Sequence, residues 1–153
     1  MGTSSQEAKS TTIIASKIAL VVAQQNRTHV DHLARSAVQT LTDSGITEER
    51  LRMMWAPSLF HVPLLAKSIA ESRDFDGIIV LGVAIKDQTD RYYMELPEVY
   101  RALMDVMMNF GIPLSCGIVS VEKHADIKRV MDAQASTNSG TQAAQDLIML
   151  LKA

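Results

Sequence analysis

The sequence predicts an α/β domain with a three-layer α/β/α sandwich, and three observations support this fold class. Residues 76–85 form a continuous apolar run, DGIIVLGVAI, which is typical of a strand buried on both faces. Apolar residues at helical spacing lie on either side of that run. Strand-like and helix-like segments alternate four times along the chain, which favours four parallel strands joined by right-handed crossovers.

Four segments are predicted strands, at residues 17–22, 51–56, 76–85 and 113–121. The segments between and after them carry apolar residues spaced as on one face of a helix. Those positions are Val30, Leu33, Ala34, Ala37, Val38, Leu41, Leu65, Ala66, Ile69, Leu96, Val99, Tyr100, Leu103, Met107, Ile127, Val130, Met131, Ala143, Ala144, Leu147, Ile148 and Leu151. Gly45 is a candidate left-handed cap, and Pro63 and Pro97 are expected near helix starts. The fourth helix is expected at residues 124–135.

Length and composition indicate one globular domain. The chain has 153 residues, 47% apolar and 21% charged, with a formal net charge of −2, so disorder, nucleic-acid binding and attachment to anionic membranes are not favoured. No apolar run approaches the roughly 20 residues of a membrane span. Residues 1–12 lack the apolar segment of a secretory signal and are predicted to form a flexible tail before a single domain at residues 13–153. A soluble cytoplasmic protein is expected.

Cysteine and histidine usage gives no disulfide or metal signature. Cys116 is the single cysteine and lies in an apolar segment, so it is interpreted as a core residue. His29 and His32 have a spacing compatible with metal binding, but no third ligand is evident and a solvated helix face is favoured. The Gly-rich phosphate motifs and the Gly-x-Ser-x-Gly nucleophile motif do not occur. No metal site and no cofactor are predicted.

The polar stretch after the central strand is the first place where a site is expected. Residues 86–91, KDQTDR, follow directly on the apolar run, and ligands of open α/β sheets bind at the carboxyl ends of strands. Arg91 is an always-charged planar donor that can pair with phosphate or carboxylate. The favoured alternative is that Arg91 pairs with Asp87 or Asp90 within its own turn.

Several short motifs together resemble the lumazine synthase family. PSLFHVP at residues 57–63 looks like the family's PGAFEIP, and GVAIKDQT at residues 82–89 looks like GAVIRGET. The first strand ending before Asn26, FGIP before the fourth strand and NSG before the last helix add to a likeness that covers about residues 17–152. It implies a flavodoxin-like sheet order 2-1-3-4, a cyclic homopentamer or larger shell, and condensation of a ribitylaminouracil with a butanone phosphate in riboflavin biosynthesis.

The resemblance also implies a site in a cleft between subunits. Its substrate-binding positions here are Gln25, Asn26, Ser58, Leu59, Phe60, His61, Val83, Ala84, Ile85, Asp87, Gln88, Thr89 and Met131. Arg91 falls at the position of the family's proton-shuttling His, with Tyr92 as the alternative if the loop shifts by one residue. In the family an aromatic residue before the Asn stacks on the pyrimidine, a Glu holds the ribityl chain, and a Gly-Glu-Thr turn and a later Arg bind the phosphate.

This chain departs from the family at most of those positions. The substituted positions are Gln25, Ser58, His61, Asp87, Gln88, Arg91, Met131 and Ala135, which stands near the family's assisting Lys. Asn26 and Thr89 match the family. Asp87 places a carboxylate where a phosphate dianion should bind, so like charges repel. Met131 removes the cation that would compensate.

Three functions from different classes remain open. The first is a working lumazine synthase, because the family's chemistry depends largely on holding two reactants in the right orientation. Loss of a general acid–base His then reduces the rate by ~10²–10⁴-fold without necessarily abolishing it. A degenerate paralogue acting as a scaffold or shell subunit is favoured, since binding residues are lost together with the His. The third is a protein for a different small-molecule ligand, using Gln25, His61, Gln88 and Arg91. Self-assembly is expected, and residues 11–15 form a β-prone stretch for pairing with a neighbour's sheet edge.

Overall fold

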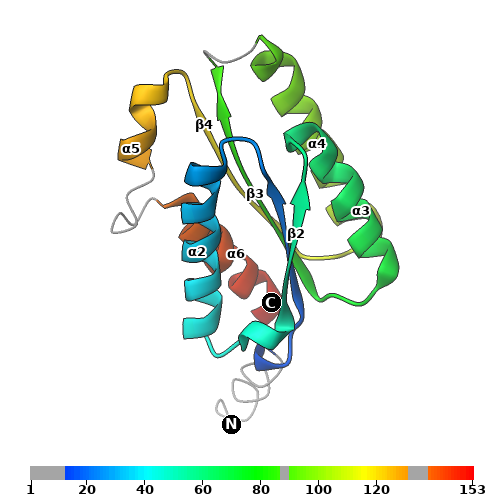
Figure 1. Ribbon diagram of the computed structural model, residues 1–153. Coiled ribbons are helices and arrows are strands. Elements are labelled where there is room, and N and C mark those ends of the chain that lie inside the picture. Colours follow the sequence, from blue (N-terminus) through cyan, green and yellow to red (C-terminus); the bar gives the residue numbers. More distant parts are fainter. Residues whose placement is uncertain (1–12, 87–89, 131–137) are drawn as a thin grey trace.

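The computed structural model describes residues 13–86, 90–130 and 138–153 (Figure 1). Its sheet has four strands: β1 (Ile18–Ala23), β2 (Leu51–Ala56), β3 (Gly77–Ile85) and β4 (Leu114–Val121). Their order is β2-β1-β3-β4 and every pairing is parallel. The fold class, the sheet order and the approximate strand positions predicted from the sequence are therefore confirmed.

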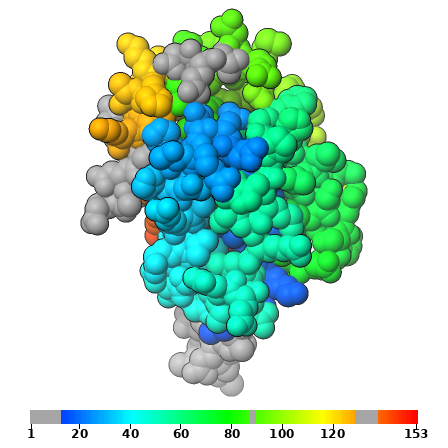
Figure 2. All heavy atoms as spheres, viewed as in Figure 1, coloured from blue at the N-terminus to red at the C-terminus, as the bar shows by residue number. Residues whose placement is uncertain are grey.

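Helices cover both faces of the sheet. They are α2 (Arg27–Asp43), α3 (Val62–Ser72), α4 (Arg91–Phe110), α5 (Ile127–Val130) and α6 (Ser139–Lys152), with 3-10 turns η1 (Glu48–Arg50), η2 (Leu59–His61) and η4 (His124–Asp126). Helices α2 and α6 lie on one face, and α3 and α4 lie on the other (Figure 1). The near surface of the molecule is formed largely by α2 in blue and cyan and by the β2–α3 segment in teal and green (Figure 2).

Strand alternation divides the core into two halves. Ile18, Leu20 and Val22 of β1 pack toward α2 and α6, whereas Ala19 and Val21 pack toward α3 and α4. All nine residues of β3 are buried, as expected for a central strand covered on both faces. Gly45 has φ +98° after α2 and Pro63 lies in the first turn of α3, so both predicted boundary roles are confirmed.

The start of α4 differs from the sequence prediction. The polar loop was expected to run through Arg91, with Pro97 near the helix start, but α4 already begins at Arg91 and Pro97 lies inside it. A proline has no backbone N–H, so the carbonyl of Tyr93 lacks its usual helical partner at this point. Tyr92, in the first turn of α4, lines a small cavity together with Ala84 and Ile85 near the carboxyl end of β3.

Two further segments differ from expectation. Residues 13–15 form a helical turn closed by the Ser16 N–H to Ile13 C=O hydrogen bond (3.0 Å), rather than extended chain, and Ile13 is buried. The predicted fourth helix is present as η4 and α5, while residues 131–135 lie outside the described residues. None of the described helices has the length and hydropathy needed to cross a membrane.

Candidate functional site

Two loops meet the end of β3 at the carboxyl edge of the sheet, because parallel strands end at the same edge. The first loop follows β1, and the Gln24 N–H donates to the Ala56 C=O of β2 (2.9 Å). The Gln25 side chain then bridges two segments: its Oε1 accepts from the Leu59 N–H (2.9 Å), and its Nε2 donates to the Val83 C=O at a longer 3.4 Å. The structure therefore brings together residues 34 and 58 positions apart.

Asn26 completes this junction. Its Nδ2 donates to the same Val83 C=O (3.0 Å), and its backbone is left-handed, with φ 57° and ψ 45°. Asparagine tolerates this conformation better than most residues. The Asn26 C=O accepts from the N–H groups of His29 and Val30 (3.0 and 3.1 Å), so Asn26 turns the chain from β1 into α2. Both the left-handed backbone and the side-chain hydrogen bond explain why an asparagine suits this position.

A glycine in β3 lets the β2–α3 loop approach the sheet. A Cβ at Gly82 would lie 2.5 Å from Leu59 Cδ2, which is closer than side chains pack. Leu59 is buried against the strand, and its N–H donates to Gln25 Oε1. Leu59 therefore anchors the loop that carries Ser58, Phe60 and His61 to the site.

The outer part of that loop is exposed. Ser58 Oγ and His61 Nδ1 are 2.9 Å apart and share a hydrogen bond. The Phe60 ring meets the His61 ring edge to face at a centroid distance of 5.5 Å, while Phe60 is 68% exposed. These three predicted site residues lie together at the rim, where they can meet a ligand or a neighbouring subunit.

A small cavity lies between this junction and the start of α4. Its volume is about 30 Å³, and its lining is Gln25, Leu59, Ala84, Ile85, Tyr92, Glu95 and Leu96. That volume is close to the share of one water molecule in the liquid, so a sugar-sized ligand needs further space or a second subunit. The site residues predicted from the sequence do not include Glu95 or Leu96.

The cations beside the cleft interact with protein groups. The Arg27 guanidinium lies 3.5 Å from the Trp55 ring centroid and 3.2 Å from Asp31. Lys86 Nζ lies 3.8 Å from a Glu122 oxygen and 4.9 Å above the Tyr93 ring. The hydrogen bond with Tyr93, followed by the charge of Glu122, raises the pKa of Lys86.

The remaining predicted site residues belong to two groups. Arg91 is exposed in the first turn of α4, and its catalytic role stays a prediction. Asp87, Gln88, Thr89 and Met131 lie outside the described residues. Across the part of the chain that the structure describes, no group of three or more His, Cys, Asp or Glu side chains is arranged to hold a metal ion.

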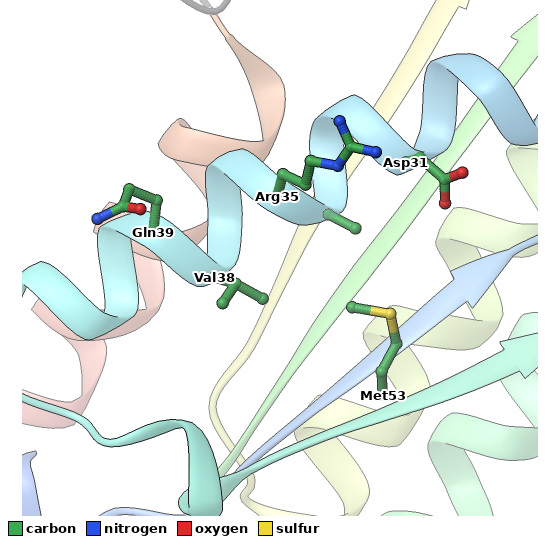
Figure 3. Close-up of a pocket in the computed structure, with 6 residues that line it drawn as sticks. Asp31, Arg35, Val38, Gln39 and Met53 are labelled. Atoms are coloured by element: carbon green, nitrogen blue, oxygen red, sulfur yellow. The ribbon is translucent and has the colours of Figure 1, made fainter.

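A larger hollow lies away from these residues, between α2 and the edge strand β2. Its volume is about 500 Å³, and it is lined by Asp31, Ala34, Arg35, Val38, Gln39 and Met53. Met53 points from β2 toward the side chains of α2 (Figure 3). Since β2 pairs with β1 alone among the described strands, this hollow runs beside an open sheet edge.

Comparisons with a family model and with individual proteins agree on one family. The matching family model is described as 6,7-dimethyl-8-ribityllumazine synthase and covers residues 15–153. Relatives bearing that name include one from Halorhodospira halophila, 30% identical over 136 residues (89% of this chain, 85% of the relative). Another, from Leuconostoc mesenteroides subsp. mesenteroides, is 29% identical over 135 residues (88% and 86%). A Coxiella burnetii relative is 30% identical over 104 residues (68% and 69%). With the sheet order and the Asn26 junction, these matches show that the chain belongs to the 6,7-dimethyl-8-ribityllumazine synthase family.

Proposed function

We propose that this chain is a lumazine synthase family protein that keeps the family's assembly but has a strongly reduced or lost condensation activity. The observation that carries the proposal is that the Gln25 side chain is hydrogen-bonded within the protein. It stands where the resemblance implies an aromatic residue stacked on the pyrimidine, and both ends of its amide are bonded to backbone groups of Leu59 and Val83. An aromatic stack contributes roughly 0.5–1.5 kcal/mol beyond area burial. Gln25 contributes to holding the loops instead.

The residue at the proton-shuttle position supports the same proposal. An arginine stays protonated at neutral pH and has no acceptor atom, so Arg91 cannot take up a proton as a histidine does. Loss of a general acid–base group costs roughly 10²–10⁴-fold in rate. Arginine can still bind an anion. Arginine in place of the family's His is therefore expected to lower the reaction rate more than the binding of an anionic ligand.

Weak phosphate binding is the third part of the proposal. Asp87 stands in the phosphate turn and Met131 near the expected cation. The neighbouring cations Arg27 and Lys86 already contact Asp31 and Glu122. A lost charge-assisted hydrogen bond costs roughly 1.5–3 kcal/mol, so these two substitutions together are expected to weaken phosphate binding by two or more orders of magnitude, at ~1.4 kcal/mol per tenfold.

Assembly as a homopentamer is supported by two surfaces of the single chain. Among the described strands, the edge strand β2 pairs with β1 alone, beside the hollow of Figure 3, and such edges are normally covered. On the opposite layer, α4 exposes large apolar side chains, which are Tyr93, Met94, Tyr100, Met104 and Met108. Apolar surface of this kind marks an interaction site. A neighbouring subunit would also enlarge the small cleft beside Gln25.

A second candidate function, binding of a different polar ligand, is favoured by the rim of the cleft. Ser58 and His61 form a hydrogen-bonded pair beside the exposed Phe60 ring. A hydroxyl, an imidazole and an aromatic face can together recognise a polar ring or a polyol. This candidate predicts binding of a ribityl pyrimidine analogue or a related polyol without turnover.

The test compares the unmodified protein with a restored variant. Condensation is followed by absorbance, and binding of inorganic phosphate is followed by calorimetry. Asp87→Gly with Met131→Arg should recover phosphate affinity first, and adding Arg91→His should then be needed for rate. A matched control, Asp74→Gly with Met149→Arg, makes the same chemical changes at exposed positions away from the cleft and should change neither readout. Full family-level turnover by the unmodified protein would reject the proposal.

A further inference from the structure

Two histidines from distant parts of the chain meet at the end of the sheet. His29 lies in the first turn of α2, and His124 is the first residue of η4. Their ring centroids are 5.5 Å apart, with an interplanar angle of 67°, an edge-to-face arrangement. Neutral aromatic rings attract one another in this geometry. The contact joins the segment after β4 to the beginning of α2, and α5 lies beside that end of α2 in Figure 1.

The charged and titratable surroundings of His29 disfavour its protonation. His124 faces it from η4, and His32 lies one turn later on its own helix. The carboxylate of Asp31 on α2 is paired with Arg27, while Lys123 and Asp126 flank His124 in sequence. The first turn of a helix is also the positive end of its dipole, where a cation is destabilised.

We propose that the His29–His124 pair is a pH-sensitive latch, which holds η4 and α5 against the beginning of α2 at neutral pH and loosens them in mildly acidic solution. Protonation of both rings replaces an edge-to-face attraction by repulsion between like charges. Ile127, which follows η4, is buried in the core between the sheet and α2. It keeps the segment attached, so the expected change is local opening rather than unfolding of the domain.

The direction of the pH dependence follows from the folded state. Burial first, then the charge of His124 and that of His32, lower the pKa of His29 from its ordinary value of 6.5. A group whose pKa is lowered by folding contributes stability above its ordinary pKa and loses it as the pH falls toward the folded value. The latch is therefore closed above about pH 6.5 and weakens below it.

The test is amide hydrogen exchange of the unmodified protein and of two variants, His29→Gln and His124→Gln, at about pH 7.5 and about pH 5.5. After correction for the intrinsic pH dependence of exchange, protection of residues 124–130 in the unmodified protein should fall roughly tenfold at the lower pH, equivalent to about 1.4 kcal/mol. Either variant should remove most of that fall. The matched control His61→Gln, which changes the histidine of the β2–α3 loop, should keep it.

Three results would overturn the latch. One is an equal pH dependence in His29→Gln and the unmodified protein. Another is a fall in protection of β3 as large as that of residues 124–130, which would indicate global destabilisation. If a variant does not fold, a nuclear magnetic resonance titration of the unmodified protein decides. The latch requires the pKa of His29 to lie below its ordinary value, and a pKa of His29 at or above that value would reject it.

Discussion

The two helical layers of this molecule differ in how far a single chain completes them. In the α2–α6 layer, helix packs on helix so closely that a Cβ at Gly140 would lie 2.2 Å from the Leu33 carbonyl oxygen. Helix α6 exposes Met149 and Leu150 near its end, whereas α4 exposes large apolar side chains along its length, from Tyr93 to Met108. In the first layer, the facing sides of α2 and α6 are closed by the chain itself. The second has a finished inner face and an outer face suited to a partner.

The largest effect is expected on the free energy of unfolding, when substitutions on the inner and outer faces of α4 are compared. Leu103 is 1% exposed and Met104 is 54% exposed, although they are adjacent in sequence. Leu103→Ala removes buried contacts and leaves a cavity, so it should lower the free energy of unfolding by roughly 2–5 kcal/mol. Met104→Ala should change it by less than about 0.5 kcal/mol in the monomer. Denaturant unfolding of both variants measures the difference, and equal losses would contradict the assignment of the inner face.

The next effect tests how closely α2 and α6 pack against each other. Gly140→Ala places a methyl group against backbone atoms of Leu33, which cannot move aside as a flexible side chain can. We expect a loss of about 3 kcal/mol, at the upper end of overpacking costs. Gly111→Ala is the matched control, because nothing lies within 4 Å of a Cβ there. Its positive φ of 61° alone should cost roughly 1–2 kcal/mol.

The outer face of α4 is tested by charge rather than by size. Met104→Glu with Met108→Glu should convert an assembled protein to monomers in light scattering, because two carboxylates would be buried without partners. The stability of the monomer should change by less than about 0.5 kcal/mol, since both side chains are exposed in it. Met149→Glu, on α6, is the matched control and should leave the assembly intact. Assembly by the double variant would move the interface to another surface.

The sheet was predictable from the sequence for a simple reason. Residues 77–85 are buried on both faces, and a strand in that position has to be apolar without interruption. The start of α4 was not predictable in the same way. Residues 91–95, RYYME, lie between the polar stretch and the proline, and Pro97 suggested a helix start, whereas the structure places the proline inside the helix.

The sequence predicted where several of the candidate site residues meet, but not the contacts that they make there. Motif order and the rule for parallel sheets placed it at the carboxyl edge, and Gln25, Asn26, Leu59 and Val83 do meet there. The bridging role of Gln25 could not be predicted, because it depends on strand register and on the close approach that Gly82 permits. The predicted site residues do not include Glu95, which lines the small cavity.

The last and smallest expected effect concerns chemical labelling of Cys116. The labelling rate tests whether the inner face of the α4 layer, which packs on the sheet, stays closed to solvent without a partner. Burial raises the pKa of the Cys116 thiol from 9.0 to about 11. At about pH 8 the thiolate fraction then falls by roughly a hundredfold, and the thiolate is the reactive species. Native protein should therefore react with a small alkylating reagent at least about a hundredfold more slowly than urea-unfolded protein, with Cys116→Ser as the blank. The Met104→Glu, Met108→Glu variant should react as slowly as the unmodified protein, because its substitutions change only the outer face of α4. Fast labelling of that variant would show that the inner face depends on assembly, and that the second layer is incomplete on both of its faces.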